Sequence, residues 1–348
     1  MYVSKIVKNI DADHIIVHSL RKDTPVNFVQ DFTKNTQFIK LIMKRNISLP
    51  LDILNIYYLR KIIKTVQPDL LHLHSSKAGI LGRIASINLR VKTIYTPHGF
   101  SFLRKDISKM KRFFYFFIEK TAAQLIRTTY FLCVSKEEYN QAVKLNRKKT
   151  RVKLIFNSVD TGQVIDRSET CVNPYQIVTI GRLTAAKNPF EILSIINDLV
   201  KTYPQLNFVW IGDGDLRIEF EAKAKSLGLP VTITGWLPKD KVNQILRASF
   251  IFIQASLWEG LPFSLLEAML EKKPVVVSNI PGHRDVIVHT VNGFIAKDTV
   301  EFCNFISDIL LNHEKAQLIG SEAYKTVINK FSDDIFVKNL LKFYHYLL

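Results

Sequence analysis

Short apolar runs alternate with stretches of helical periodicity along most of the chain, and polar or glycine-containing turns separate them. In the first half, apolar runs that predict strands are interleaved with segments whose apolar residues fall on one helical face. The strands are expected at residues 14–20, 70–74, 93–96, a run ending at 133–135, and 152–156, and the helices at 1–10, 51–66 and 78–89. This alternation predicts a parallel sheet.

The second half repeats the rhythm, with strands expected at residues 177–180, 208–211, 231–234, 250–254, 275–278 and 292–295. We therefore predict an α/β protein with two Rossmann-like parallel-sheet domains, formed by residues 1–157 and 158–334, that face each other across a cleft. The linker is placed at 157–162. The amphipathic helix at 335–348 is expected to pack back on the first domain.

The beginning of the chain departs from this plan, because a helix at residues 1–10 precedes the first predicted strand. A nucleotide-binding α/β half normally begins with a strand and a glycine-rich turn. We therefore expect the first strand of the N-terminal domain to be missing from this sequence.

Two glutamates flank a predicted loop-to-helix junction in residues 255–271 (ASLWEGLPFSLLEAMLE). Proline suits the first position of a helix, so the helix is expected to begin near Pro262. The backbone N–H groups of residues 263–265 would then face the carboxyl end of the preceding strand, where an α/β sheet binds anions. Glu259 and Glu267 could hold sugar hydroxyls. The alternative is a buried strand and helix with two solvated glutamates.

A second group of polar residues follows the strand at 177–180, where GRLTAAKNP places Gly181, Arg182 and Lys187 in one tight turn. Glycine lets a ligand approach the backbone closely, and the two cations suit the phosphates of a nucleoside diphosphate.

The next strand ends in GDGDLR, which contains the aspartate pair that many metal-dependent sugar transferases use. Because this triplet follows a strand and opens a helix, we interpret Gly212 and Gly214 as turn glycines and Asp215 as a helix cap. No metal site is predicted from it.

In the first half of the chain, two predicted strands end on polar residues, in the motifs HLHSSKAG and TPHGF. Residues at the carboxyl ends of parallel strands line the ligand crevice. The candidates for acceptor or cleft contacts are therefore His74, Ser75, Lys77, His98 and Gly99. A structural role would explain either histidine alone, but two at adjacent strand ends favour a function.

The length and composition agree with a two-domain globular protein, since the chain has 348 residues, of which 47% are hydrophobic, with 13 Gly and 12 Pro. No apolar run reaches the roughly 18 residues of a spanning helix, and no signal peptide is visible. Cys133, Cys171 and Cys303 are far apart and lack metal-ligand spacing. These features indicate a reducing cytoplasm.

The net charge of +17 lies entirely in the first part of the chain. Residues 1–155 contain 29 Lys and Arg against 10 Asp and Glu, whereas the remainder contains 19 against 21. Within this basic part, residues 100–130 mix cations with phenylalanines, as interfacial helices do. We infer an anionic membrane surface as partner; single-stranded nucleic acid, inward-packed phenylalanines and a merely solvated basic face are the alternatives.

The motifs together resemble those of the family 4 glycosyltransferases, which are retaining enzymes of GT-B architecture. The resemblance is to bacterial members that build capsular, exopolysaccharide or O-antigen repeat units. It covers nearly the whole chain, in family order, through HLHSSKAGILGR, TPHGFSF, VSKEE, GRLTAAKNP, GDGDLR, SLWEGLPFSLLEAM, and SNIPGHRDVI with NGF.

The resemblance implies a role for each matching residue. Arg182 and Lys187 would bind the donor diphosphate and stabilise the leaving nucleotide, and Glu259 would contact the donor sugar. His98 would meet that sugar from the first domain, through its ring or its backbone carbonyl. No protein nucleophile, metal or other cofactor is implied. The remaining donor contacts would come from Gly181, Gly212, Gly214, Trp236 near the base, Phe263, Ser264, Leu265, and Glu267 at the ribose.

The resulting hypothesis is transfer of a sugar from a nucleotide sugar, UDP-linked, to a polyprenyl-diphosphate-linked oligosaccharide. The enzyme would lie in the cytoplasm, peripheral at the inner face of the plasma membrane, with no nucleic acid partner. The alternatives are a sugar-nucleotide epimerase of similar fold and an inactive, N-terminally truncated homologue that binds anions. A phosphorylase is disfavoured, because the chain is short and has no lysine motif of the pyridoxal kind.

Overall fold

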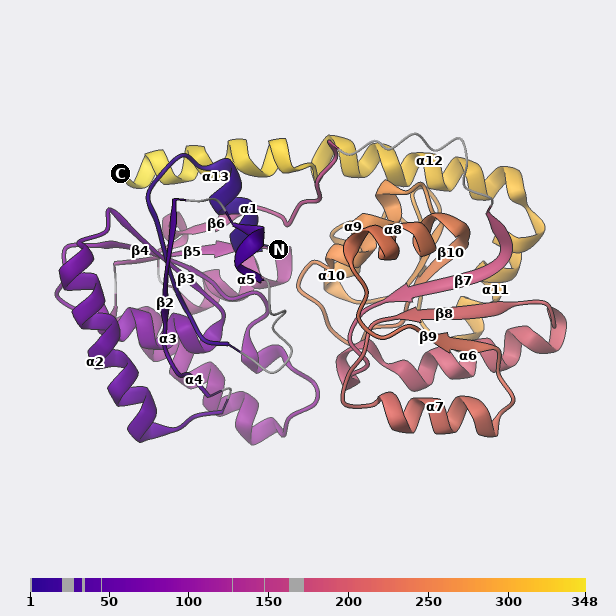
Figure 1. Cartoon of the computed structure of the whole chain (residues 1–348), viewed down its shortest axis with the longest axis horizontal. Coiled ribbons are helices and arrows are strands. Elements are labelled where there is room, and N and C mark those ends of the chain that lie inside the picture. Colours follow the sequence, from indigo (N-terminus) through magenta and orange to yellow (C-terminus); the bar gives the residue numbers. More distant parts are fainter. Residues whose placement is uncertain are drawn as a thin grey trace. The chain divides into compact units, whose positions relative to one another are not determined.

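The computed structural model describes residues 2–20, 28–32, 35–44, 46–126, 128–146, 148–162 and 172–348, so Cys171 lies outside the described residues. The chain divides into two compact units (Figure 1). The first unit contains Met1–Leu103, Lys109–Phe156 and Asp333–Leu348. The second unit contains Arg104–Ser108 and Asn157–Ser332.

The strands of the first unit are all parallel and form two sheets, with the orders β1-β2 and β3-β4-β5-β6. Among the described residues, no strand pairs with both β1 and β3. The elements are α1 (Tyr2–Asn9), β1 (His14–His18), η1 (Phe28–Asp31), β2 (Thr36–Lys40), α2 (Leu49–Val66), β3 (Leu70–His74), α3 (Ser76–Ala85), β4 (Lys92–Thr96), η2 (Ser101–Leu103), α4 (Lys109–Leu125), β5 (Thr129–Cys133), α5 (Lys136–Leu145), η3 (Lys149–Arg151), β6 (Val152–Leu154) and α13 (Asp333–Leu347).

Helix α3 packs very closely against β3 and β4 because two of its residues have no side chain. A Cβ at Gly79 would lie 2.2 Å from the ring of Tyr95, and one at Gly82 would lie 2.3 Å from Leu73. The same helix carries Arg83, which is fully buried and donates to Glu119 on α4 at 2.5 Å. Tyr95 donates to the other oxygen of Glu119 at 2.8 Å. This buried network ties α3, α4 and β4 together.

The second unit has one six-stranded parallel sheet with the order β12-β11-β10-β7-β8-β9. In Figure 1, α6 and α7 lie below the strands, and α8 and α9 lie above them. The elements are β7 (Asn173–Ile180), η4 (Ala185–Lys187), α6 (Pro189–Thr202), β8 (Asn207–Ile211), α7 (Arg217–Ser226), β9 (Val231–Ile233), α8 (Lys239–Ala248), β10 (Ser249–Gln254), α9 (Phe263–Leu270), β11 (Val275–Ser278), α10 (Pro281–Arg284), β12 (Phe294–Ala296), α11 (Thr299–Leu311) and α12 (His313–Lys330).

The sheet of the second unit is almost completely covered, as expected for strands with helices on both faces. Trp210 and Phe208 from β8, and Ile251 and Ile253 from β10, are each at most 2% exposed.

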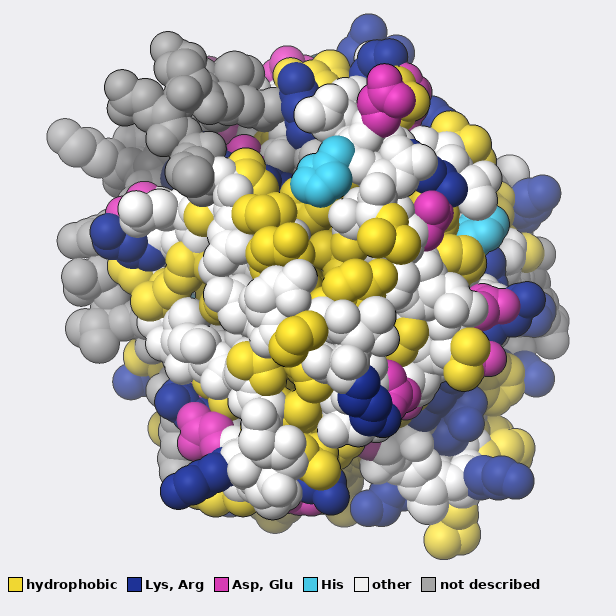
Figure 2. Space-filling view, turned by 90° about the vertical axis from the view of Figure 1, so that its right-hand side faces the viewer, with side chains coloured by type: hydrophobic (Ala, Val, Ile, Leu, Met, Phe, Trp, Pro, Cys, Tyr) yellow, Lys and Arg dark blue, Asp and Glu magenta, His cyan; other side chains and the backbone are white. Residues whose placement is uncertain are grey.

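The side of the molecule seen in Figure 2 carries both signs of charge beside apolar side chains. That mixture agrees with the nearly neutral balance of this half of the sequence.

The alternation of strand and helix predicted from the sequence is confirmed, but the ends of some elements differ and some elements were not predicted. The predicted strand at 14–20 ends at His18, and the predicted helix at 78–89 is α3, which begins and ends earlier. Ser86 donates to the carbonyl of Arg83 at 2.8 Å just after α3, and Asn88 has a left-handed φ of 60°. Both features end the helix. The strand β2 and the helices α5, α8, α10, α11 and α12 were not predicted.

Candidate active site

The strand order of the second unit has a switch point between β7 and β10. The chain proceeds from β7 to β8 on one side of the sheet and enters β10 on the other side. Ligands of doubly wound sheets bind beside such a point, at the carboxyl ends of the strands. Here the turn after β7 and the loop after β10 are joined directly, because the N–H of Leu257 donates to the carbonyl of Ala186 at 2.8 Å. Two predicted groups of site residues therefore meet.

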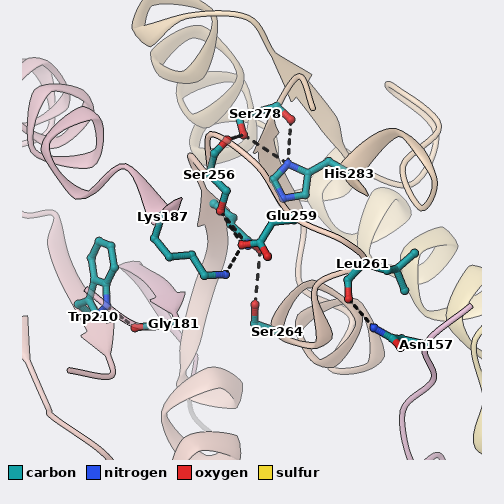
Figure 3. A network of polar contacts seen from close by, with 11 residues as sticks. Asn157, Gly181, Lys187, Trp210, Ser256, Glu259, Leu261, Ser264, Ser278 and His283 are labelled. Carbon is teal, nitrogen blue, oxygen red and sulfur yellow. Dashed lines mark hydrogen bonds and ion pairs between the residues drawn. The ribbon is translucent and has the colours of Figure 1, made fainter. Parts of the chain in front are cut away.

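The centre of this arrangement is an ion pair between Lys187 and Glu259, with 2.6 Å between Nζ and Oε1 (Figure 3). The side chains keep only 17% and 18% of their surface exposed. Ser256 donates its hydroxyl to the same oxygen at 3.0 Å, and the amide of Gln254 donates to it at 3.1 Å. One cation and two neutral donors therefore fix the carboxylate.

These contacts keep Glu259 ionised. Burial alone would raise the pKa of this carboxyl, but the charge and hydrogen bond of Lys187, together with Ser256, lower it below the ordinary value. A carboxylate held in this way can accept hydrogen bonds from hydroxyl groups. The cation beside it can bind a phosphate oxygen.

The glycines of the two turns allow this close packing. A Cβ at Gly212 would lie 2.2 Å from the carbonyl oxygen of Gly181, and one at Gly214 would lie 2.4 Å from that of Leu183. The carbonyl of Gly181 also accepts the indole N–H of Trp210 at 2.8 Å. Gly212 and Gly214 thus shape the site by packing the turn after β8 against the turn after β7.

Helix α9 begins at Phe263 with Pro262 at its N-cap, which confirms the predicted start. The N-cap residue makes no side-chain hydrogen bond, and the backbone N–H groups of Phe263, Ser264 and Leu265 form the positive end of the helix dipole. The hydroxyl of Ser264 lies 3.5 Å from the side-chain oxygen of Gln254. Glu267 lies one turn further along the helix, partly buried.

Of the other predicted donor contacts, Arg182 is exposed in the turn after β7, and Trp236 is 60% exposed after β9. The prediction that Asp215 caps the following helix is wrong. Helix α7 begins at Arg217, and its N-cap is Leu216, which donates its N–H to the carbonyl of Leu183. The neighbouring Asp213 instead accepts from Arg217 at 2.9 Å.

The first unit brings its two predicted histidines together. His74 ends β3 and pairs in register with Thr96 at the end of β4, so His98 follows close by. Nδ1 of His74 and Nε2 of His98 are 3.1 Å apart, and the rings are stacked. The residue His98 keeps part of its surface exposed, but burial of its ring among neighbouring groups lowers the pKa of the ring to about 4. Burial lowers the pKa of His74 well below its ordinary value. Both rings are therefore neutral near pH 7.

A hydrogen bond from the next residue, Gly99, to the side chain of Glu138 fixes the loop that carries His98. Gly99 has a left-handed φ of 96°, and open space surrounds the position of its absent Cβ. Its N–H donates to the carboxylate of Glu138, whose other oxygen accepts from Val134 at 3.0 Å. Ser135, the N-cap of α5, accepts the N–H of Glu138 at 3.2 Å and so fixes the start of this helix. The VSKEE motif therefore supports the His98 loop.

The other predicted cleft residues lie at the start of α3. Ser75 is the N-cap and has a positive φ of 74°. Lys77 is directed toward α2, where it pairs with Asp52 at 2.8 Å, and it donates to the carbonyl of Asn46 at 2.6 Å. Lys77 is thus part of the contact between α2 and α3.

His283 is a site residue that the sequence did not single out. It lies on α10, is fully buried, and is directed toward Glu259 in Figure 3. Burial lowers the pKa of its ring to about 4, and Glu259 and Lys187 act on it with opposite signs. The motif SNIPGHRD marked a strand end, but nothing in it indicated that this side chain turns inward.

The basic aromatic stretch at 100–130 forms α4 and the segments on either side of it. The alternative that its phenylalanines pack inward does not hold for three of them, since Phe113, Phe114 and Phe117 are 71%, 51% and 58% exposed. Phe116 alone among the four of this helix packs inward, edge-on to Phe102.

The described part of the chain has no cluster of His, Cys, Asp and Glu that could hold a metal ion. Within the same residues, none of the helices is both long and apolar enough to cross a membrane. The absence of a metal requirement stays a prediction.

Comparison with known proteins identifies the family. The family model described as Glycosyltransferase Family 4 matches residues 4–163, and the model described as Glycosyl transferases group 1 matches residues 164–326. The chain belongs to the family 4 glycosyltransferases. The order of the motifs in the sequence therefore reflects a true family relationship, and the protein is a transferase.

Two relatives from Escherichia coli carry the names of glycosyltransferases. An Escherichia coli protein named UDP-Gal:alpha-D-GlcNAc-diphosphoundecaprenol alpha-1,3-galactosyltransferase is 29% identical over 307 residues, 83% of this chain and 78% of the relative. The E. coli O-antigen biosynthesis glycosyltransferase WbnH is 29% identical over 71% of this chain and 69% of its own length.

Solved structures show the same fold. Anabaena Alr3699/HepE in complex with UDP has a TM-score of 0.77 at 18% identity and covers 98% of this chain and 94% of its own. A glycosyltransferase from Rickettsia africae has a TM-score of 0.75 at the same identity, covering 99% and 93%. The predicted GT-B architecture of two Rossmann-like domains is confirmed.

Proposed function

We propose that this glycosyltransferase transfers a sugar, with retention of configuration, from a UDP-sugar to a polyprenyl-diphosphate-linked oligosaccharide. The product would be a repeat unit of a bacterial surface polysaccharide. The names of the E. coli relatives support both the donor and the acceptor class. The structure with UDP bound, Anabaena HepE, supports a uridine nucleotide as the leaving group.

The observation that carries the proposal is the Lys187–Glu259 pair at the switch point of the second sheet. A nucleotide sugar presents two phosphates, which need cations and N–H donors, beside hydroxyl groups, which need acceptors. Lys187 and the start of α9 supply the first kind of group, and Glu259 supplies the second. Arg182 adds a forked cation from the same turn.

In the reaction, negative charge develops on the diphosphate as the bond to the sugar breaks. Lys187, Arg182 and the positive terminus of α9 would stabilise that charge, and preorganised groups of this kind provide large rate effects. Glu259 would orient the donor sugar, and Glu267 the ribose. The neutral His98, beside His74 at 3.1 Å, is a further candidate for contact with a substrate. No step is assigned to a protein nucleophile, and no metal is invoked.

We propose further that the protein works peripherally at the cytoplasmic face of the plasma membrane, where its acceptor is anchored. Helix α4 carries exposed Phe113, Phe114 and Phe117, with Lys109 and Lys111 beside them. Aromatic rings that insert at the headgroup boundary and cations that attract anionic lipid are the two requirements of an interfacial helix. The arrangement therefore suits bilayer binding better than a packed core.

The transfer is tested by incubating the protein with a panel of UDP-sugars and lipid-linked acceptor, and by measuring UDP release and the glycolipid product. Loss of a preorganised charged group in such a site costs about 100- to 1,000-fold in rate. We expect losses of this order in Glu259→Ala and Lys187→Ala. The matched control is Lys315→Ala, which removes another lysine that pairs with a carboxylate, Asp308, on the surface of the same unit.

The alternatives predict other results. A sugar-nucleotide epimerase would convert a nucleotide sugar when no acceptor is added. A binding protein without activity would release no UDP with any donor, and full activity in both site variants would show that this pair is not the donor site.

Membrane binding is tested by sedimentation with vesicles that contain anionic lipid. Phe113→Ser combined with Phe117→Ser should lower the partition coefficient at least about tenfold, because each ring contributes roughly 1.5–3 kcal/mol when fully buried. The control pair, Ile218→Ser with Leu318→Ser, removes exposed apolar side chains from the second unit. Equal binding by both double variants would contradict the role of α4.

A further inference from the structure

His283 lies behind the Lys187–Glu259 pair in a fully closed environment. Its Nδ1 is 2.8 Å from the backbone oxygen of Ser278 and 3.4 Å from the hydroxyl of that residue. A carbonyl oxygen only accepts, so Nδ1 carries the hydrogen. In the neutral ring, Nε2 then bears the lone pair. This atom is buried and has no hydrogen-bond partner in the part of the chain that the structure describes.

The hydrogen bonds that fix His283 and those that fix Glu259 form one continuous network. The hydroxyl of Ser278 donates to the backbone oxygen of Ser256 at 2.6 Å, and the hydroxyl of Ser256 donates to Oε1 of Glu259 at 3.0 Å. Figure 3 shows the imidazole on one side of this network, turned toward the carboxylate. A buried ring nitrogen without a partner costs free energy, and another state of the site that uses this nitrogen would explain why it is kept.

The charges around His283 indicate what that other state is. Burial lowers the pKa of the imidazole most, and the positive charge of Lys187 lowers it further. The hydrogen bond to the Ser278 carbonyl and the charge of Glu259 raise the pKa, but the balance leaves the ring neutral. Glu259 and Lys187 are the charged groups that act on His283 among the described residues. A donor diphosphate bound to Lys187 would compensate its positive charge and leave the effect of Glu259 in place.

We propose that His283 is a positioning residue, which takes up a proton at Nε2 when the donor diphosphate engages Lys187 and then holds the carboxylate of Glu259. The inference rests on the proposed function, since it requires a diphosphate at Lys187. The proton comes from solvent, and no other bond forms or breaks. The carboxylate that orients the sugar keeps a cationic partner while Lys187 serves the leaving group.

Donor binding would therefore be coupled to proton uptake, and affinity would rise as the pH falls below neutrality. A purely structural histidine would not give this coupling, because its ring would stay neutral in both states.

The first experiment is calorimetric titration of the full chain with UDP near pH 6, in two buffers with different ionisation enthalpies. The variant His283→Asn keeps an amide N–H for the Ser278 carbonyl but does not titrate. The terminal phosphate of UDP titrates in the same range, and its contribution is common to both proteins. We expect wild type to take up roughly half a proton more per UDP than the variant, since loss of a nearby charge effect moves a pKa by about 1–3 units.

The control variant is His313→Asn, which removes an exposed histidine of α12 in the same unit. It should take up as many protons per UDP bound as wild type does. Equal proton uptake by wild type and His283→Asn would overturn the proposal. If wild type fails to bind UDP at all, the proposed function fails, and this inference fails with it.

A second measurement does not depend on folding of the variant. In wild-type protein labelled at histidine carbons, the Cε1–H resonance of His283 should titrate at higher pH with saturating UDP than without it. A resonance that reports a neutral ring in both states, down to about pH 5, would refute the proton uptake.

Discussion

Removing Lys187 should leave Glu259 as a carboxylate without its cation inside the second unit. In the protein, Nζ and Oε1 are 2.6 Å apart, and less than a fifth of each side chain is exposed. The variant Lys187→Met keeps the length of the side chain and removes its charge. The neutral donors from Ser256 and Gln254 would remain, at 3.0 and 3.1 Å.

The size of the effect follows from these contacts. Breaking a fully buried ion pair on one side costs about 3–5 kcal/mol. The residual exposure and the two remaining donors reduce the expected cost of Lys187→Met to about 2–3 kcal/mol. Glu259→Gln should cost about 1 kcal/mol or less. This variant removes the buried carboxylate, and the remaining ammonium group of Lys187 can extend toward water on its long side chain. Adding Lys187→Met to Glu259→Gln should then cost little more.

The pH dependence has a definite sign. Because the pKa of Glu259 is lowered in the folded state, the pair stabilises the protein above the ordinary carboxyl pKa, and this contribution is lost as the pH falls through the folded value. The difference between wild type and Lys187→Met should therefore shrink on acidification.

The assay is urea unfolding followed by tryptophan fluorescence. All three tryptophans, Trp210, Trp236 and Trp258, belong to the second unit, so the signal reports that unit alone. A cost for Lys187→Met below about 0.5 kcal/mol, or the same cost with and without Glu259→Gln, would refute the reasoning.

Three further predictions concern packing and protonation. Gly212→Ala should destabilise the second unit by more than about 3 kcal/mol in the fluorescence assay, whereas Gly228→Ala, where a Cβ meets nothing, should cost only about 1 kcal/mol. Arg83→Met should cost about 3–5 kcal/mol in thermal or urea unfolding followed by circular dichroism, because it leaves the buried Glu119 carboxylate without its cation; a cost below about 1 kcal/mol would contradict this. Burial lowers the pKa of His72 to about 3, so the unfolded state takes up its proton first, and acidification from pH 7 to 5 should cost at most about 2 kcal/mol at this site. His72→Gln should remove that part of the pH dependence; an unchanged pH dependence would contradict the assignment.

The sequence predicted the strand-end turns because their signals are local. An apolar run followed by glycine and a cation marks the turn at Gly181, and proline marks the start of α9 at Pro262. The contact between Lys187 and Glu259 could not be read in this way. It depends on β7 and β10 lying side by side, which is a property of the sheet order.

Other parts of the site depend on the direction of side chains, which periodicity does not determine. His283 sits in a short helix where no pattern shows an inward-facing ring. Glu138 was part of a recognised motif, but its contact with Gly99 joins residues 39 positions apart. In α4, the helical phase separates Phe113 and Phe117, which are exposed, from Phe116, which packs inward.

The most direct test of the donor site is the dissociation constant of UDP, measured by calorimetry for wild type, Lys187→Met and the control Lys315→Met. A charge-assisted hydrogen bond contributes about 1.5–3 kcal/mol, so loss of Lys187 should weaken UDP binding about 10- to 100-fold. The control should bind as wild type does. Equal affinity in all three proteins would contradict the assignment of the Lys187–Glu259 pair to the donor diphosphate and sugar.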